Sequence, residues 1–271
     1  MADTERYQTP KLSQNWFIRL AFLLSSVLLA ILLHRFIIYL FRLATTPNTS
    51  RNHSTNEPGT LENTVELEQC RQESNKLVEL WQHPDKSSFV FISLDLGISD
   101  ENEHRITDIG LSRWCIGDKS HPKSYHYLIN RYGQNQDKYM LSRRDPFLFG
   151  ETEFINESDI GLFLSYSFSS MTSKYGTICL VCHDVSRSIR LLQPYWEVPS
   201  GVLTIDTLKI WRAHNGTTEN ITLEQCLFTM LDLKWDEISG NAGNRARSLI
   251  QLLHTQGQFS ISTKTTPKTV Q

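Results

Sequence analysis

Asp95 ends an apolar run, and the residue two positions later is Gly97. An Asp-x-Glu pair at the end of such a run would place two carboxylates on one face of a strand, because successive side chains alternate between the faces. Two carboxylates at the edge of a sheet can hold two divalent cations about 4 Å apart, an arrangement that activates water for phosphodiester hydrolysis. Gly97 supplies no carboxylate, so the chain presents half of such a clamp.

A second group of polar residues follows another apolar run. His183 and Asp184 come directly after it, and a histidine beside an aspartate can act as a general base. The same position also suits a helix cap, and we favour this interpretation, in which Asp184 caps the first turn of the next helix. Asp206 is predicted to cap a further helix in the same way.

The stretch Cys179-Leu-Val-Cys-His183 matches the C-x-x-C-H pattern of covalent haem attachment. Its apolar flanks predict a buried strand, however, and residues three apart on a strand point to opposite faces. Both thiols therefore cannot reach one porphyrin, and the sequence predicts no haem. The remaining cysteines lack the paired spacing of zinc ligands: Cys70, Cys115 and Cys226.

The elements that would position these residues follow an α/β order. Strands are predicted at 89–95, 106–114, 125–130, 177–182 and 202–205. Helices are predicted at 158–174, 185–195, 207–212, 223–231 and 242–256. Three strands followed by alternating helices and strands predict an α/β domain with a mixed sheet flanked by helices.

Four stretches within 89–257 carry a resemblance to a known family. They are Phe91-Ile-Ser-Leu-Asp95 with Ile106-Thr-Asp-Ile-Gly-Leu-Ser112; Phe147-Leu-Phe-Gly-Glu151; Leu180-Val-Cys-His-Asp184 with Ile205-Asp-Thr207; and Gly240-Asn-Ala-Gly-Asn-Arg-Ala246. In this order they resemble the DEDD-type 3′–5′ exonucleases, and most closely a fungal group of exonuclease-like proteins named after a yeast factor linked to the mRNA-export DEAD-box helicase. The resemblance implies an RNase H-like fold and a cleft built for metal-dependent nucleic-acid hydrolysis.

The resemblance also implies which positions have lost that chemistry. Asp95 matches the first acidic ligand, whereas the other three ligand positions hold Gly97, Ser188 and Arg245, and the position of the general base holds Gly240. One carboxylate cannot offset the charge of two dehydrated Mg²⁺ ions. Arg245 would instead pair with Asp95 or bind a phosphate oxygen.

This pattern predicts a degenerate, catalytically inactive exonuclease-like domain that needs no cofactor and binds RNA or a protein partner. The alternative is an active 3′–5′ exonuclease that uses Mg²⁺ or Mn²⁺ and replaces the lost ligands by other acidic residues: Asp184, Asp206 or Glu151. The net charge of −2 provides no overall attraction to nucleic acid, so RNA binding would need a local basic patch. The candidates for such a patch, or for an ordinary solvated face, are Arg143 with Arg144; Arg187 with Arg190; and Arg212, Arg245 and Arg247.

An apolar segment at 16–41 precedes the domain and is long enough to cross about 30 Å of hydrocarbon. We expect a retained single-pass anchor in a lipid bilayer; a surface or buried helix is the alternative, because His34 and Arg35 interrupt the run. The topology is nearly balanced, since basic residues flank both ends and five glycosylation sequons favour a lumenal domain: Asn48, Asn52, Asn156, Asn215 and Asn220. The odd number of cysteines, 5, and the exonuclease resemblance favour a cytosolic domain.

The sequence therefore divides into five parts. A tail at 1–15 precedes the anchor at 16–41, and a tether with one short helix follows at 42–88. Within that linker, 44–60 is predicted to be flexible and 62–82 to be a helix that docks onto the domain. The exonuclease-like domain occupies 89–257, and a disordered tail is predicted at 258–271.

Overall fold

The computed structural model describes residues 58–99, 102–116, 118, 121–130, 146–233 and 241–265. Among these residues, no helix combines the length and the apolar character needed to cross a membrane. The predicted anchor at 16–41 and the predicted tail at 1–15 lie outside the described residues. So do some residues singled out in the sequence: Asn48, Asn52, Arg143, Arg144 and Gly240.

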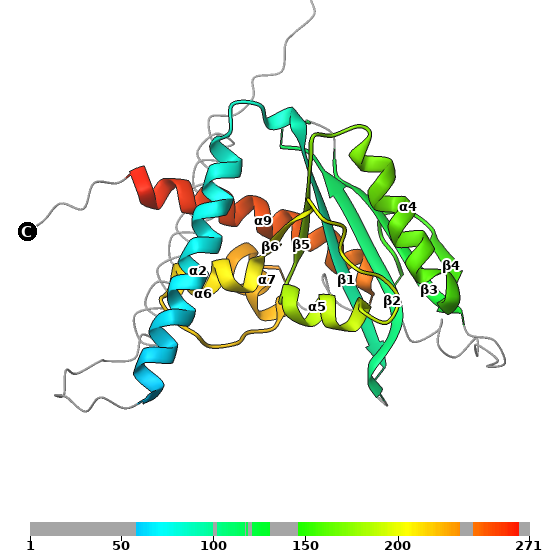
Figure 1. Ribbon diagram of the computed structural model, residues 1–271, viewed down its shortest axis with the longest axis horizontal. Helices are drawn as coiled ribbons and strands as arrows, with labels where there is room; N and C mark the ends of the chain where they lie inside the picture. Colours follow the sequence, from blue (N-terminus) through cyan, green and yellow to red (C-terminus); the bar gives the residue numbers. More distant parts are fainter. Residues whose placement is uncertain are drawn as a thin grey trace, which may run out of the picture. The chain divides into compact units, whose positions relative to one another are not determined.

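A mixed sheet of six strands forms the centre of the domain (Figure 1). The strands are β1 (Phe89–Ser99), β2 (Asn102–Trp114), β3 (Lys123–Asn130), β4 (Thr152–Asn156), β5 (Thr177–Cys182) and β6 (Leu203–Asp206). Their order across the sheet is β4-β3-β2-β1-β5-β6. The first three strands pair antiparallel, whereas β4 runs parallel to β3, and β5 and β6 run parallel to β1.

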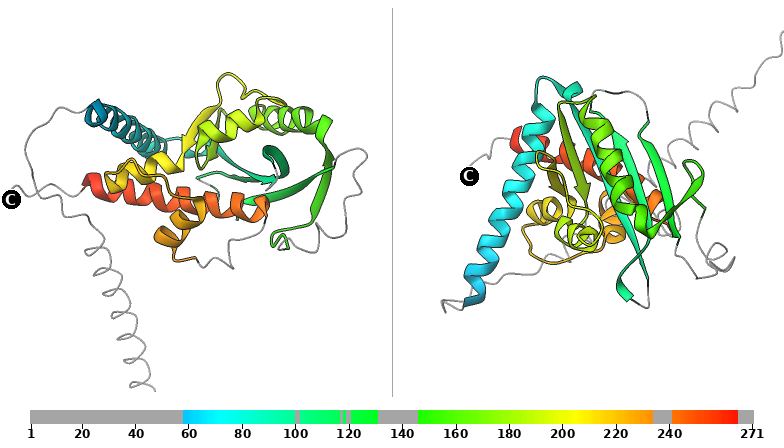
Figure 2. Two further views of the ribbon diagram at one scale, coloured as in Figure 1. Left: turned by 90° about the horizontal axis from the view of Figure 1, so that it is seen from below. Right: turned by 45° about the vertical axis from the view of Figure 1, so that its right-hand side comes forward.

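Helices cover both faces of this sheet, as the two views of Figure 2 show. They are α2 (Pro58–Gln82), α4 (Ile160–Thr172), α5 (Val185–Leu192), α6 (Thr207–Asn215), α7 (Leu223–Leu231) and α9 (Ala242–Thr265), with short 3₁₀ helices η1 (Lys86–Ser88) and η2 (Glu157–Asp159). One core joins α2, α6, α7 and α9 to the sheet, and a second core joins α4 and α5 to its other face. The alternation of buried side chains along β1 and β5 serves both cores, which is why these strands are almost continuously apolar.

The order of helices and strands predicted from the sequence is confirmed, with one strand missed. β4 pairs only with β3 at the edge of the sheet, and its side chains are half-buried or exposed, so it lacks the apolar alternation of a half-buried strand. The predicted disordered tail is wrong for residues 258–265, because α9 continues to Thr265. In this continuation Ser260 is buried and Ile261 is only partly buried against the core, so the sequence carries little hydrophobic pattern there.

The predicted docking of the helix at 62–82 is confirmed, and the helix is longer at its start. α2 begins at Pro58, inside the segment predicted as flexible. Its last turns enter the core, where Trp81 packs against Phe91 with ring centroids 5.6 Å apart. Gly257 in α9 allows this approach, because a Cβ there would lie 2.6 Å from the Trp81 ring. The folded unit therefore starts before residue 89.

Candidate functional site

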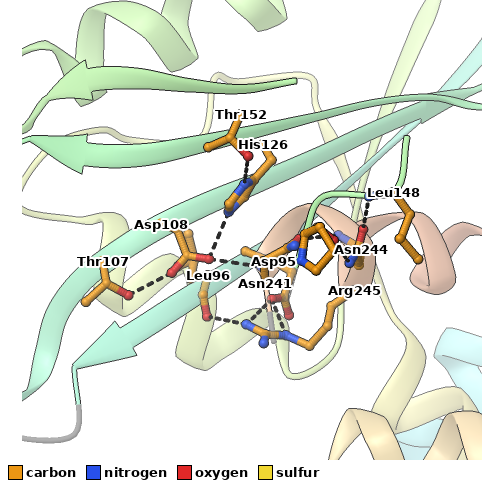
Figure 3. A network of polar contacts seen from close by, with 12 residues as sticks. Asp95, Leu96, Thr107, Asp108, His126, Leu148, Thr152, Asn241, Asn244 and Arg245 are labelled. Carbon is orange, nitrogen blue, oxygen red and sulfur yellow. Dashed lines mark hydrogen bonds and ion pairs between the residues drawn. The ribbon is translucent and has the colours of Figure 1, made fainter. Parts of the chain in front are cut away.

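The candidate site lies where β1, β2 and β3 meet the start of α9 (Figure 3). In the antiparallel register, Asp95 faces Gly110 and Gly97 faces Asp108, so these four positions share one face of the sheet. His126 on β3 faces Gly110 from the other side. The strands thus bring two carboxylates and an imidazole to the same end of α9.

Asp95 is held by Arg245, as the sequence predicted. The Nε and Nη2 atoms of Arg245 lie 2.8 Å and 2.7 Å from Oδ2 of Asp95. Nη2 also donates to the Leu96 carbonyl at 3.4 Å. Only 17% of the Arg245 side chain and 18% of the Asp95 side chain are exposed, so the pair is shielded from solvent. Charge-assisted contacts of this kind are stronger than neutral hydrogen bonds.

The pKa values of the pair reflect burial and charge. Burial raises the pKa of Asp95 to about 6, while the Arg245 guanidinium lowers it. The carboxylate of Asp95 in turn raises the pKa of Arg245 above its ordinary value. Arg245 therefore remains charged and supplies the positive charge that keeps Asp95 ionised near neutral pH.

Asp108 fills the space that a side chain at position 97 would need. A Cβ added to Gly97 would lie 1.7 Å from Oδ1 of Asp108, which no real structure tolerates. The two positions are direct cross-strand partners, so the carboxylate of β2 projects over the glycine of β1. A glutamate at position 97 and Asp108 in this rotamer exclude each other.

Asp108 is itself fully engaged in the fold. Its Oδ2 accepts hydrogen bonds from the Ala242 backbone N–H at 2.9 Å and contacts Nε2 of His126 at 3.2 Å. Its Oδ1 accepts from the Thr107 hydroxyl at 2.7 Å. The other ring nitrogen of His126 lies 2.9 Å from the Thr152 hydroxyl. Because Asp108 is 2% exposed and sits at the N-terminus of α9, it stabilises the helix start that carries Arg245.

The sequence Asn241-Ala-Gly-Asn-Arg245 folds as a tightly packed helix start. The Asn241 side chain accepts from the Asn244 N–H at 2.8 Å and so caps α9. Gly243 has no side chain because a Cβ would lie 2.6 Å from Cβ of His126. The Asn244 side chain holds the segment before β4 by accepting from the Leu148 N–H at 3.0 Å (Figure 3). These contacts fix the direction in which Arg245 points.

Two of the proposed substitute ligands act as helix caps, as the sequence predicted. Asp184 accepts from the Arg187 N–H at 3.1 Å at the start of α5. Asp206 accepts from the Leu208 N–H at 3.0 Å at the start of α6 and also from the Asp184 N–H at 3.1 Å. Asp206 is 4% exposed, and its carboxylate is directed at backbone N–H groups.

Neither of the two remaining predicted positions, Glu151 and Ser188, lines the cleft described below. Glu151 precedes the edge strand β4, which two strands, β3 and β2, separate from β1. Ser188 lies in α5, where its hydroxyl donates to the Asp184 carbonyl at 3.2 Å. A hydroxyl bound to its own helix offers no anionic oxygen to the site.

His183 is fixed through both ring nitrogens. Nδ1 lies 3.1 Å from the Thr207 hydroxyl, and Nε2 lies 3.0 Å from the Ile221 carbonyl. Burial lowers the pKa of His183 below its ordinary value. A neutral imidazole with its proton on Nε2 donates to the Ile221 carbonyl, so His183 connects β5 to the loop before α7.

A cleft of about 630 Å³ opens over the Asp95–Arg245 pair. It is lined by charged groups, by His183 and by apolar and polar side chains from β1, α6 and the segment before α7. The charged lining residues are Asp95, Asp108, Asp184, Glu224, Arg187 and Arg245. Four carboxylates against two guanidinium groups leave the cleft with an excess of negative charge.

The predicted group of Arg212, Arg245 and Arg247 does not form a basic patch. Arg212 is 8% exposed and pairs with Glu66 of α2 at 2.7 Å. Arg247 is also 8% exposed, with its guanidinium 5.1 Å from the centre of the Phe149 ring. Each of the three guanidinium groups thus serves an internal contact. Arg187 and Arg190 lie on α5, and their side chains are exposed.

The prediction that Cys179 and Cys182 point to opposite faces of a buried strand is confirmed. Cys179 belongs to the core on one face of the sheet and Cys182 to the core on the other face. In the described part of the chain the cysteines are free and buried: Cys70, Cys115, Cys179, Cys182 and Cys226. Burial raises the pKa of the Cys179 thiol to about 12, so this thiol is inert.

The described residues do not fit a pair of divalent cations. Arg245 lies against the single matching carboxylate, and Asp108 is directed at the helix start and at His126. Among the residues that the structure describes, no three or more His, Cys, Asp or Glu side chains are arranged to hold a metal ion. Two such cations need several convergent anionic oxygens, whereas here the guanidinium of Arg245 lies against the Asp95 carboxylate.

Asp108 and His126 were not identified from the sequence as site residues. Each is a polar residue inside a strand whose neighbours are buried, and each is almost fully buried itself. A buried aspartate near a buried histidine on an adjacent strand marks a structural network. The sequence does show an aspartate between apolar residues of a strand, in Ile106-Thr-Asp-Ile-Gly110. Only the pairing of β2 with β3, however, brings Asp108 and His126 together.

Comparisons with known proteins agree with this architecture. Residues 90–255 match the family described as DNA polymerase III subunit epsilon-like, C-terminal domain, of the DEDDh type. Among solved structures, the Pan2 catalytic unit of Neurospora crassa, comprising a protease and a nuclease domain, is similar with a TM-score of 0.40 and 13% identity; the match covers 66% of this chain and 28% of that one. No curated protein matches the sequence. The family match covers more than half of the chain, so the chain belongs to the DEDDh exonuclease-like family, and its mixed sheet flanked by helices is the RNase H-like exonuclease fold.

Proposed function

We propose that this domain is a pseudo-exonuclease, which keeps the fold and the cleft of its family but does not hydrolyse nucleic acid. The observation that carries the proposal is the buried ion pair between Arg245 and Asp95. Arg245 provides one fixed positive charge where the family chemistry uses two divalent cations. A guanidinium stabilises a carboxylate, but it neither lowers the pKa of a bound water nor releases a hydroxide.

The alternative of an active enzyme with replaced ligands has less support. Asp206 is committed to two helix starts, Glu151 lies at the edge strand, and Asp184 caps α5 from a left-handed backbone conformation with φ 63°. His183 is the histidine that lines the cleft, and its two ring nitrogens are engaged with Thr207 and Ile221. A general base needs a free nitrogen within reach of the attacking water.

The finer resemblance, to the fungal exonuclease-like proteins, supports a role in binding. We favour a protein partner over RNA, because the cleft carries more carboxylates than guanidinium groups and the candidate arginines 212, 245 and 247 are engaged internally. RNA binding depends on cationic side chains that are free to pair with phosphates and so release the counterions condensed on the RNA. Arg187 also lines the cleft, and among the described residues its guanidinium makes no internal contact like those of the other three arginines.

The first test is a nuclease assay on the full chain, purified in detergent. Single-stranded RNA and DNA incubated with it in Mg²⁺ or Mn²⁺ should keep their length, because loss of metal activation removes many powers of ten in rate, commonly 10⁶-fold or more (~8 kcal/mol). An Asp95→Ala variant is the matched control for contaminating nucleases. Shortening from the 3′ end that disappears in Asp95→Ala would contradict the proposal and favour the active alternative.

We further propose that the chain is anchored in a membrane by its segment at 16–41, with the domain in the cytosol. The support is the apolar sequence, which is long enough for the hydrocarbon of a bilayer, about 30 Å. The full chain should stay in the membrane pellet after carbonate extraction, and a chain that starts at Thr45 should be found in the supernatant. Release of the full chain by carbonate would show that the segment lies on the membrane surface or packs against protein instead.

A further inference from the structure

Arg212 joins helix α2 to one wall of the cleft. This wall is the segment 219–222, three of whose residues line the cleft. From α6, Nε of Arg212 donates to the Glu219 carbonyl at 3.1 Å, and Nη2 donates to the Asn220 side-chain oxygen. The remaining nitrogen, Nη1, donates to Oε1 of Glu66 in α2 at 2.7 Å. One nearly buried guanidinium therefore bridges α2 and the wall.

A second carboxylate of α2 supports another part of the cleft lining, the start of α5. Oε1 of Glu73 accepts the Asp206 backbone N–H at 2.9 Å. The Asp206 carboxylate in turn accepts the backbone N–H groups of Asp184 and Val185, both at 3.1 Å. Asp184 lines the cleft at the start of α5. Glu73 thus supports the turn that positions α5.

The two carboxylates lie on one face of α2 because they are seven residues apart, which is close to two helical turns. The C-terminal part of α2 is held by apolar packing, with Leu77 fully buried and Trp81 6% exposed. Up to Glu73 the helix contributes fewer buried side chains; Cys70 is fully buried, whereas Val65 is 54% exposed. This part of α2 can therefore detach locally while the core stays closed.

We propose that residues 58–73 of α2 form a strap that controls how firmly the lining of the cleft is held. When the strap is docked, Glu66 fixes the wall at 219–222 and Glu73 fixes the start of α5; when it detaches, both parts of the lining loosen. Any partner or tension that acts on α2 then changes the affinity of the cleft, and by linkage a ligand in the cleft changes the docking of α2. The family match begins at residue 90, so the strap lies outside the matched residues. The inference rests on the proposed role of the cleft as the binding site, but not on whether the cleft hydrolyses its ligand.

The test is hydrogen exchange of the full chain in detergent, which requires no ligand. Glu66→Ala should speed hydrogen exchange in residues 217–225 about tenfold. The substitution removes the charge-assisted contact that holds the Arg212 guanidinium, which in turn binds the wall at 219–222. Glu73→Ala should speed exchange at the start of α5, residues 183–188, and leave 217–225 nearer to the unchanged rate. The matched control is Glu68→Ala, because Glu68 lies on the exposed side of the same helix and pairs only with exposed Arg71 in the described structure.

Two outcomes would overturn the strap. One is faster exchange that is uniform over the domain, or confined to α2, in both Glu66→Ala and Glu73→Ala. The other is the same pattern of change in Glu68→Ala. If Glu66→Ala does not fold, Arg212→Lys provides the same test, because an ammonium keeps the charge but cannot make three contacts in the fixed geometry of a guanidinium. A nuclease-positive chain with an intact strap response would contradict the proposed function alone.

Discussion

Replacing Arg245 by glutamine should lower the free energy of unfolding by about 3–5 kcal/mol at pH 8, the typical cost of removing one partner from a buried ion pair. The reason is that Asp95 stays behind as a largely buried carboxylate, 18% exposed, without a cation. The nearby Asp108 and Glu224 carboxylates add repulsion. Urea unfolding of the two proteins, followed by tryptophan fluorescence, measures the difference.

The loss should depend on pH in a defined direction. Burial raises the pKa of Asp95 from 3.8 to about 6, so the stability that its protonated form provides is complete below pH 3.8 and is lost as pH rises through about 6. Without Arg245, the effect that lowers this pKa is gone, and the loss continues at higher pH. The difference between the two proteins should therefore be smaller at pH 5 than at pH 8, by up to about 2.7 kcal/mol, because one group contributes ~1.4 kcal/mol per pH unit between pH 6 and 8.

Two controls separate charge pairing from other effects. Arg190→Gln removes an exposed arginine from α5 and should change stability by no more than about 0.5 kcal/mol. Asp95→Asn combined with Arg245→Gln removes both charges and should abolish the added pH dependence. A loss in Arg245→Gln that is equal at pH 5 and pH 8 would show that Arg245 stabilises by packing alone. Arg245→Asp, which adds a carboxylate, should be less stable than Arg245→Gln at pH 8.

Some features of the candidate site can be predicted from the sequence alone. The pairing of Arg245 with Asp95 was predictable, because the family resemblance placed both at one cleft and charge required a partner for the carboxylate. The caps Asp184 and Asp206 were also predictable, since each stands between a strand and a helix and the cap is a local feature. These predictions needed no knowledge of strand register.

The missed features depend on contacts between distant parts of the chain. Asp108 lies over Gly97 only because of the register of β1 with β2, and His126 reaches Asp108 only through the pairing of β2 with β3. For α2, the sequence predicts that the helix docks onto the domain but not which contacts it makes. The bridge from Glu66 to Arg212 joins residues 146 positions apart. No local pattern in a single sequence reports such contacts.

Gly97→Ala should be strongly destabilising, although alanine is normally tolerated better than glycine in a strand. The new Cβ would lie 1.7 Å from Oδ1 of Asp108, and that carboxylate cannot move without breaking its hydrogen bonds to Ala242 and Thr107. Overpacking in a closed site costs about 1–3 kcal/mol, and a broken buried polar contact adds to it. Gly176→Ala is the matched control, because a Cβ there meets its nearest atom at 3.7 Å.

A double-mutant cycle then tests whether the effects of Gly97 and Asp108 on stability are coupled. Coupling is expected if the Asp108 carboxylate occupies the space that a side chain at position 97 would need. Asp108→Ala alone should destabilise the fold, since it leaves the Ala242 N–H and the His126 ring without their acceptor. In that background, however, the carboxylate no longer fills the space over position 97, so adding Gly97→Ala should cost little. We expect a coupling energy of about 1–3 kcal/mol from unfolding curves of the four proteins. Additive costs would mean that the Asp108 carboxylate does not hold this position in solution, and the absence of a glutamate at 97 would then need another explanation.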